Sequence, residues 1–264
     1  MASTGTRTTV LVLAMAVGTM LLAGPAAAAA PATAPAPAFA TSGAVTAGTS
    51  HNWAGYAQTA PAGSFTAVEG SWTVPAVTAT PSGVAETLDW IGIDGFGTKN
   101  VLVQAGTESD DNNGVAYYSA WTEILPARYV RLSLAVSPGD RVDVVVQETA
   151  TNVWSMKVTD LTTGMSGDRT VAYRALGRSV EAIQERPCVG GAGCSFSTLS
   201  QTSAVTFTGL GDSTAAAGQP ATFAPLLSAA PGARLHSIKM VPGSSVPPVR
   251  PSVPGTGNEA FTVA

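Results

Sequence analysis

The sequence predicts an all-β fold, an antiparallel β-sandwich. Short segments of alternating apolar and polar residues recur along the chain, turn signals separate them, and no amphipathic helix intervenes. The composition agrees with this interpretation, since 28 Gly and 18 Pro accompany a hydrophobic content of 45%. We therefore expect many short strands packed in two layers.

The expected strands follow one another from residue 65 to residue 263. The segment Arg141–Thr149 is the clearest, because Val142, Val144 and Val146 face one way while Asp143 and Gln147 face the other. The other expected strands are Phe65–Val74, Glu86–Ile93, Val101–Glu108, Val115–Glu123, Tyr129–Val136, Val153–Asp160, Arg169–Arg174, Val180–Glu185, Ala204–Gly209, Leu235–Val241 and Ala260–Val263.

Turn signals lie between these segments, among them residues 61–63, 110–114, 138–140 and 163–164. The run Asp110–Gly114 resembles part of a calcium-binding loop, but the Glu that would complete such a loop downstream is missing. We therefore interpret this run as a hairpin turn.

The N-terminal residues 1–30 have the pattern of a secretory signal peptide. Arg7 precedes an apolar run from Val10 to Leu22, and an alanine tract with a small-x-small cleavage pattern follows. This run is shorter than the about 20 apolar residues that a membrane span needs, although an uncleaved anchor is the alternative. Residues 31–50 read as a Pro/Ala/Thr-rich linker or pro-segment, and residues 51–264 as one exported β-sandwich domain.

Charge and composition exclude several classes of function. The net charge is −4, with 13 Lys and Arg against 17 Asp and Glu, so we expect neither nucleic-acid binding nor a membrane surface as partner. With two His and two Cys, we expect no metal and no cofactor. The sequence lacks the G-x-S-x-G, H-E-x-x-H, P-loop and Rossmann patterns. His51 and His236 are either triad bases or structural histidines, and we favour the structural role.

Cys188 and Cys194 enclose a short Gly-rich stretch. In an exported protein we expect them to form a local disulfide, with free thiols as the alternative. A loop this short would hold local geometry more than it would stabilise the whole domain.

Polar residues on predicted strands are the candidates for chemistry. If Val103 and Ala105 face the core, Gln104 faces the opposite surface. Trp121 shares a strand face with Glu123, and further along the chain Glu181, Ile183 and Glu185 share another. Such faces suit a substrate groove, while a solvated strand face is the alternative for each residue taken alone.

An ordered series of motifs spans nearly the whole expected domain. It comprises Asn52-Trp-Ala-Gly55, Gly70-Ser-Trp72, Val74-Pro75, Trp90-Ile-Gly-Ile-Asp-Gly95, Val103-Gln-Ala-Gly106, Tyr118-Ser-Ala-Trp-Thr-Glu123 with Pro126, Pro138-Gly-Asp140, Ser179-Val-Glu-Ala-Ile-Gln-Glu-Arg-Pro187 and the loop closed by Cys188 and Cys194. In its order and spacing this series resembles the glutamic peptidases, or eqolisins (peptidase family G1), of the bacterial secreted type.

The resemblance implies a concanavalin-like sandwich of two bent packed sheets, with a substrate groove on one sheet, and a secreted endopeptidase active at acid pH. It implies that Gln104 and Glu185 are the catalytic pair and that Glu181 is a non-catalytic acid. The groove or substrate-binding positions that it implies are Trp53, Trp90, Asp94, Trp121 and Glu123. We expect a monomer whose partner is a polypeptide substrate, and a base that titrates near its ordinary pKa of about 4.3.

The chain departs from the family pattern at five positions. The family usually has an aliphatic residue where Gln184 stands, an aromatic residue where Ala182 stands, and aromatic residues near Thr122, Ile124 and Leu125. The lost aromatics would change subsite preference, and Gln184 could alter the setting of Glu185. A lectin-like sandwich that binds polysaccharide or peptide without cleaving it is therefore the main alternative. A structural cell-surface domain is the third.

Overall fold

A computed structural model describes residues 45–189, 194–229, 232–243 and 248–264. The expected signal peptide and most of the expected linker lie outside the described residues. Within them, strands dominate, and the one helical element is a short 3-10 helix, η1 (Leu226–Ser228). Among the described residues, no helix is long and apolar enough to span a bilayer.

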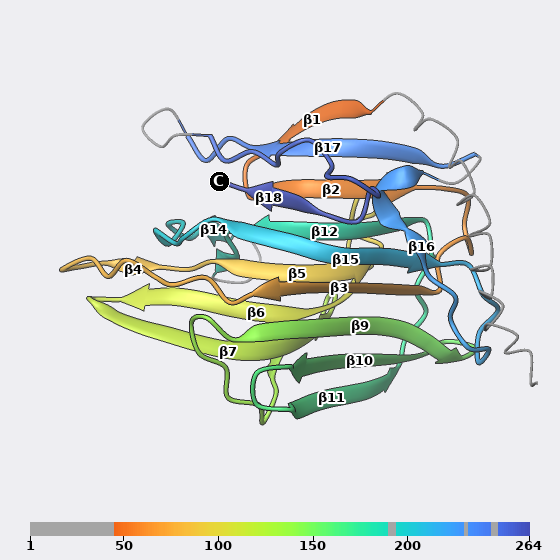
Figure 1. The fold of residues 1–264 in the computed structure, drawn as a ribbon, viewed down its shortest axis with the longest axis horizontal. Coiled ribbons are helices and arrows are strands. Elements are labelled where there is room, and N and C mark those ends of the chain that lie inside the picture. Colours follow the sequence, from red (N-terminus) through yellow and green to blue (C-terminus); the bar gives the residue numbers. More distant parts are fainter. Residues whose placement is uncertain (1–44, 190–193, 230–231, 244–247) are drawn as a thin grey trace, which may run out of the picture. The chain divides into compact units, whose positions relative to one another are not determined.

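The first sheet carries the candidate site. Its strands, in spatial order, are β1 (Thr46–Ser50), β17 (Arg234–Met240), β2 (Trp53–Thr59), β12 (Ser179–Glu185), β5 (Leu88–Ile93), β6 (Val103–Asn112), β7 (Val115–Ile124) and β8 (Val130–Arg131), with β4 (Val84–Ala85) beside β6 (Figure 1). Neighbouring strands are antiparallel except β1 and β17, which run parallel.

The second sheet packs against the first. Its order is β11 (Met165–Ala172), β10 (Val153–Asp160), β9 (Arg141–Ala150), β3 (Ala67–Thr73), β15 (Val205–Ser213) and β16 (Ala224–Pro225), with β18 (Phe261–Val263) beside β15. A separate small ribbon pairs β13 (Cys188–Val189) with β14 (Ser195–Phe196). The predicted antiparallel sandwich is thus confirmed.

The core lies between the two sheets and follows the alternation in the sequence. Val142, Val144 and Val146 are each 0% exposed on β9, and they meet Ile91 and Val103 of the first sheet within one apolar cluster. Full burial of each such side chain stabilises the fold by roughly 1.5–3 kcal/mol before entropy is counted. Because Val103 and Ala105 are in this cluster, Gln104 between them faces outward, as predicted.

The predicted strands are confirmed with shifted ends, but two expectations are wrong. Residues 46–50, assigned to the linker, form β1, which is held by backbone pairing with β17 rather than by an apolar face. The expected strand Tyr129–Val136 shrinks to the two residues of β8. Strand β2 was not predicted. Its Gly55 lies where an added Cβ would come 2.1 Å from the carbonyl oxygen of Ala182.

The predicted hairpin at residues 110–114 is confirmed, but β6 extends to Asn112 and the turn itself is shorter. Asn113 and Gly114 have φ values of 52° and 87°, as a two-residue hairpin turn requires. Asp111 supports this hairpin, since its carboxylate accepts hydrogen bonds from Thr80 and from the backbone N–H of Gly114.

Candidate active site

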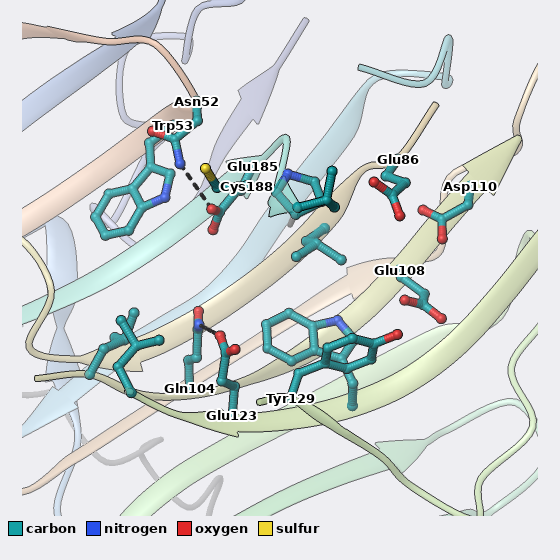
Figure 2. A pocket seen from close by; sticks show the side chains of 16 residues that line it. Asn52, Trp53, Glu86, Gln104, Glu108, Asp110, Glu123, Tyr129, Glu185 and Cys188 are labelled. Carbon is teal, nitrogen blue, oxygen red and sulfur yellow. Dashed lines mark hydrogen bonds between the residues drawn. The ribbon is translucent and has the colours of Figure 1, made fainter. Parts of the chain in front are cut away.

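A cavity of about 360 Å³ lies on the outer face of the first sheet, the face opposite the core. Side chains from β2, β12, β5, β6 and β7 and from the segments beside them form its walls (Figure 2). Its lining residues are Asn52, Trp53, Glu86, Leu88, Leu102, Gln104, Glu108, Asp110, Trp121, Glu123, Leu125, Tyr129, Glu185, Pro187, Cys188 and Val189.

Glu185, the last residue of β12, lines this cavity, and both of its carboxylate oxygens accept hydrogen bonds. The Asn52 Nδ2 group donates to Oε1 at 2.9 Å, and the Trp90 indole donates to Oε2 at 2.9 Å. Burial raises the pKa of Glu185 to about 7, the charge of Glu123 adds to the rise, and the hydrogen bonds from Trp90 and Asn52 oppose it. Burial thus places the pKa of this carboxyl above the expected value near 4.3.

Gln104 lies on β6 directly opposite Glu123 on β7. Its Nε2 group donates to Oε2 of Glu123 at 2.6 Å, whereas its Oε1 is buried without a hydrogen-bond partner. Burial also raises the pKa of Glu123, and hydrogen bonds from Gln104 and the Tyr129 backbone limit the rise. A buried amide oxygen without a partner is costly, so this atom is available to a ligand.

The cavity floor depends on a glycine between Gln104 and Glu108. An added Cβ at Gly106 would lie 2.1 Å from the carbonyl oxygen of Asp89 and 2.7 Å from the Trp90 Cβ. Gly106 therefore lets β5 and β6 approach closely, and it leaves the face between two polar side chains without a side chain of its own.

One end of the cavity is acidic. Figure 2 shows Glu86, Glu108 and Asp110 grouped away from the Gln104–Glu123 pair. Glu108 accepts hydrogen bonds from Ser119 and, at 3.0 Å, from the half-exposed Arg131. Burial and the nearby Glu108 raise the pKa of Asp110 to about 7.

The structure brings Gln104, Glu185, Trp53, Trp121 and Glu123 to one cavity, as predicted. Trp90 instead lies fully buried and contacts Glu185 through its indole N–H rather than lining the cavity. Trp90 lies on the predicted face of β5. Trp53 packs edge-on against the Trp90 ring, with ring centroids 5.0 Å apart.

The prediction for Asp94 as a substrate-binding residue is wrong in location. Its side chain is 0% exposed, and its carboxylate accepts backbone hydrogen bonds from Leu176, Gly177 and Arg178. With φ at 66°, Asp94 turns inward and fixes the segment that leads into β12. It therefore supports the start of β12 and does not line the cavity.

The neighbours of Glu185 along β12 have separate roles. Gln184 faces the other side of the sheet and donates to Asp89 at 3.2 Å, so the expectation that it alters the Glu185 carboxylate receives no support. Glu181 is fully buried, accepts the Phe96 backbone N–H at 3.0 Å, and has a pKa raised well above its ordinary value by burial.

The cysteine and histidine alternatives are resolved. Cys188 and Cys194 form the predicted disulfide, and Cys188 lines the cavity. His236 bonds the Thr59 hydroxyl at 3.0 Å, and His51 contacts the Val241 carbonyl at 3.3 Å. Neither histidine lines the cavity, so the structure gives no support to a role of either as the base of a catalytic triad there.

Some cavity residues were not predicted. Asn52 belongs to the first motif of the series, but nothing in the sequence indicates that its side chain bonds Glu185, 133 positions away. Glu86, Glu108, Asp110 and Tyr129 also line the cavity. For Glu108 a signal existed, since it shares a strand face with Gln104 in the alternation of β6.

Comparisons with known proteins give a consistent result. The family model described as the Peptidase A4 family matches residues 51–227. Aspergillopepsin-2 of Aspergillus niger is 30% identical over 155 residues, which is 52% of this chain and 54% of that protein. The chain thus spans about half the length of this curated relative.

Two solved structures are similar in fold. A scytalido-glutamic peptidase with a transition-state analogue inhibitor superposes with a TM-score of 0.64 at 23% identity, covering 81% of this chain and 98% of that one. The aspergilloglutamic peptidase from Aspergillus niger gives a TM-score of 0.54 at 26% identity, covering 68% and 98%.

Proposed function

The chain belongs to the Peptidase A4 family, and on that premise we propose that it is an exported acid endopeptidase that hydrolyses polypeptides with Gln104 and Glu185. The observation that carries this proposal is that both side chains line one cavity of about 360 Å³, although 80 residues of chain lie between them. Glu185 there has two fixed hydrogen-bond donors, and Gln104 has an amide oxygen without a partner.

Hydrolysis requires a nucleophilic water, stabilisation of the oxyanion and a proton for the leaving amine. Ionised Glu185 accepts a proton as the water oxygen bonds to the scissile carbonyl carbon. When the C–N bond breaks, the same carboxyl returns that proton to nitrogen, leaving a carboxylic acid and an amine. The process consumes one water and needs no other reactant.

Gln104 complements this proton transfer. Its amide carries an acceptor and two N–H donors, of which one is engaged by Glu123. The free acceptor holds the water, and the second N–H donates to the developing oxyanion. Removal of one such donor typically costs about 100-fold or more in rate, or ~3 kcal/mol.

The raised pKa of Glu185 sets the pH range. With a pKa of about 7, the ionised base becomes tenfold scarcer for each pH unit below neutrality. The buried carboxyls of Asp89 and Asp212, whose pKa values are raised to about 7 and about 6, stabilise the fold at low pH and lose this contribution as the pH rises towards those values. We therefore expect cleavage at weakly acidic to neutral pH and little activity at pH 3.

The experiment is digestion of an unfolded protein by the purified chain from pH 3 to pH 8, with EDTA and with inhibitors of serine and cysteine proteases. We expect cleavage that resists these reagents and disappears in Glu185→Gln. Binding of peptide or glycan without cleavage, unaffected by Glu185→Gln, would instead support the lectin-like alternative.

A further inference from the structure

The carboxylate of Glu123 accepts a short hydrogen bond from the carboxamide of Gln104. The two residues are direct partners in the β6–β7 register, and the Nε2–Oε2 distance is 2.6 Å. A second donor, the backbone N–H of Tyr129, holds the Glu123 carboxyl from the loop beside it. The carboxyl is therefore anchored on two sides.

This contact decides which end of the Gln104 amide faces the cavity. A carboxylate only accepts hydrogen bonds, whereas an amide has one end that donates and one that accepts. If the Gln104 amide rotated by half a turn, its oxygen would face the Glu123 oxygen, and two acceptors would repel each other. Glu123 therefore holds the N–H₂ end and leaves Oε1, buried and without a partner, for another group.

We propose that Glu123 is a positioning residue that acts on the reaction through Gln104, rather than a substrate-binding residue. This inference rests on the proposed function, in which the unpartnered Oε1 of Gln104 holds the water and the second N–H of Gln104 donates to the oxyanion. Without Glu123 the Gln104 side chain would populate several rotamers as well as both orientations of its amide, and only a small part of that ensemble presents the acceptor to the water. Loss of Glu123 should thus lower kcat more than it raises KM.

The charge of Glu123 adds an independent signature. It acts on Glu185 across the cavity and opposes ionisation there. The other charged groups that line the cavity are Glu86, Glu108 and Asp110, and Arg131 pairs with Glu108. Removal of the Glu123 charge should move the acid limb of the kcat/KM profile to lower pH, an effect that a purely structural role would not produce.

The test compares Glu123→Ala and Glu123→Gln with Glu69→Gln. Glu69 is a matched control because burial also raises its pKa, but it lies on β3 of the other sheet, among Gly211, Phe223 and Glu259. We expect Glu123→Ala to lower kcat by about 10-fold or more and to leave KM within about threefold of the wild-type value. The reason is that the Gln104 amide would then be oriented for the reaction only part of the time. In Glu123→Gln, the amide oxygen can still accept from Gln104, so part of kcat should return. Glu69→Gln should retain wild-type kinetics.

A side-chain amide NMR signal of Gln104, assigned by its absence in Gln104→Ala, reports the contact without catalysis. We expect the resonance of the proton bonded to Glu123 to lie downfield of its ordinary position in the wild type and to return towards that position in Glu123→Ala. Unchanged kcat in Glu123→Ala, or a raised KM alone, would overturn the positioning role while leaving the proposed function in place. A wild-type chain that cleaves no polypeptide would overturn the proposed function, and with it any catalytic role of Glu123.

Discussion

The buried pair formed by Asp89 and Gln184 should make stability depend on pH in a measurable way. Asp89 is 0% exposed, accepts one hydrogen bond from Gln184 at 3.2 Å, and has a second oxygen that is buried without a partner. Burial raises its pKa from 3.8 to about 7, against the effect of the Gln184 bond. The informative change is Asp89→Asn, which keeps an acceptor for Gln184 and cannot ionise.

The sign follows from the raised pKa in the folded state. Below pH 4 Asp89 is protonated in both states, so its stabilising effect is fully present. As the pH rises, the unfolded chain ionises first, and stability falls by ~1.4 kcal/mol per pH unit until the folded carboxyl ionises near pH 7. The shift of about three units corresponds to roughly 4 kcal/mol lost by the wild type across this window.

Urea unfolding of both proteins at pH 4, 5, 6 and 7 measures this loss. We expect the free energy of unfolding of Asp89→Asn relative to the wild type to rise steadily with pH, by several kcal/mol in total. Two stability curves that stay parallel from pH 4 to pH 7 would refute the reasoning, because they would mean that Asp89 titrates normally in the folded state.

Three further predictions concern the site and its support. The acid limb of kcat/KM should have its midpoint near pH 7, where Glu185 ionises, and a rate that is maximal at pH 3 would contradict its role as an ionised base. Gly106→Ala should destabilise the fold by about 3 kcal/mol or more in thermal unfolding, because its Cβ would lie 2.1 Å from the Asp89 carbonyl oxygen. Gly48→Ala is the matched control, with its Cβ 3.9 Å from the nearest atom, and equal losses in both would argue against the close approach of β5 and β6. Asp94→Ala should orphan three backbone N–H groups at residues 176–178 and lower the free energy of unfolding by roughly 3 kcal/mol or more, whereas a loss of less than about 1 kcal/mol would argue against that role.

Alternation along single strands predicted which side chains face the core and which face outward. It placed Val142, Val144 and Val146 in the core and Gln104 on the outer face, and both are confirmed. It also placed Trp121 and Glu123 on one face, because neighbours two apart on a strand share a side whatever the tertiary structure.

The features that were not predicted depend on contacts between segments far apart in the chain. Such contacts produce no periodic pattern in the sequence. Strand β1 forms by backbone pairing with β17, and Asn52 reaches Glu185 because β2 lies beside β12. Asp94 follows its strand with a left-handed turn, so the alternation that would have put it in the groove ends one residue earlier. Gln184 is polar on a core-facing position because Asp89 meets it there.

The most direct test of the catalytic pair is a double-mutant cycle on kcat/KM with one peptide substrate at pH 6. The variants are Gln104→Ala, Glu185→Gln and the double variant, with folding checked by circular dichroism. If both side chains act on one water, each single change should cost at least about 100-fold and the double variant should be no slower than the slower single. Wild-type rates in either single variant, or losses that simply multiply, would contradict the account.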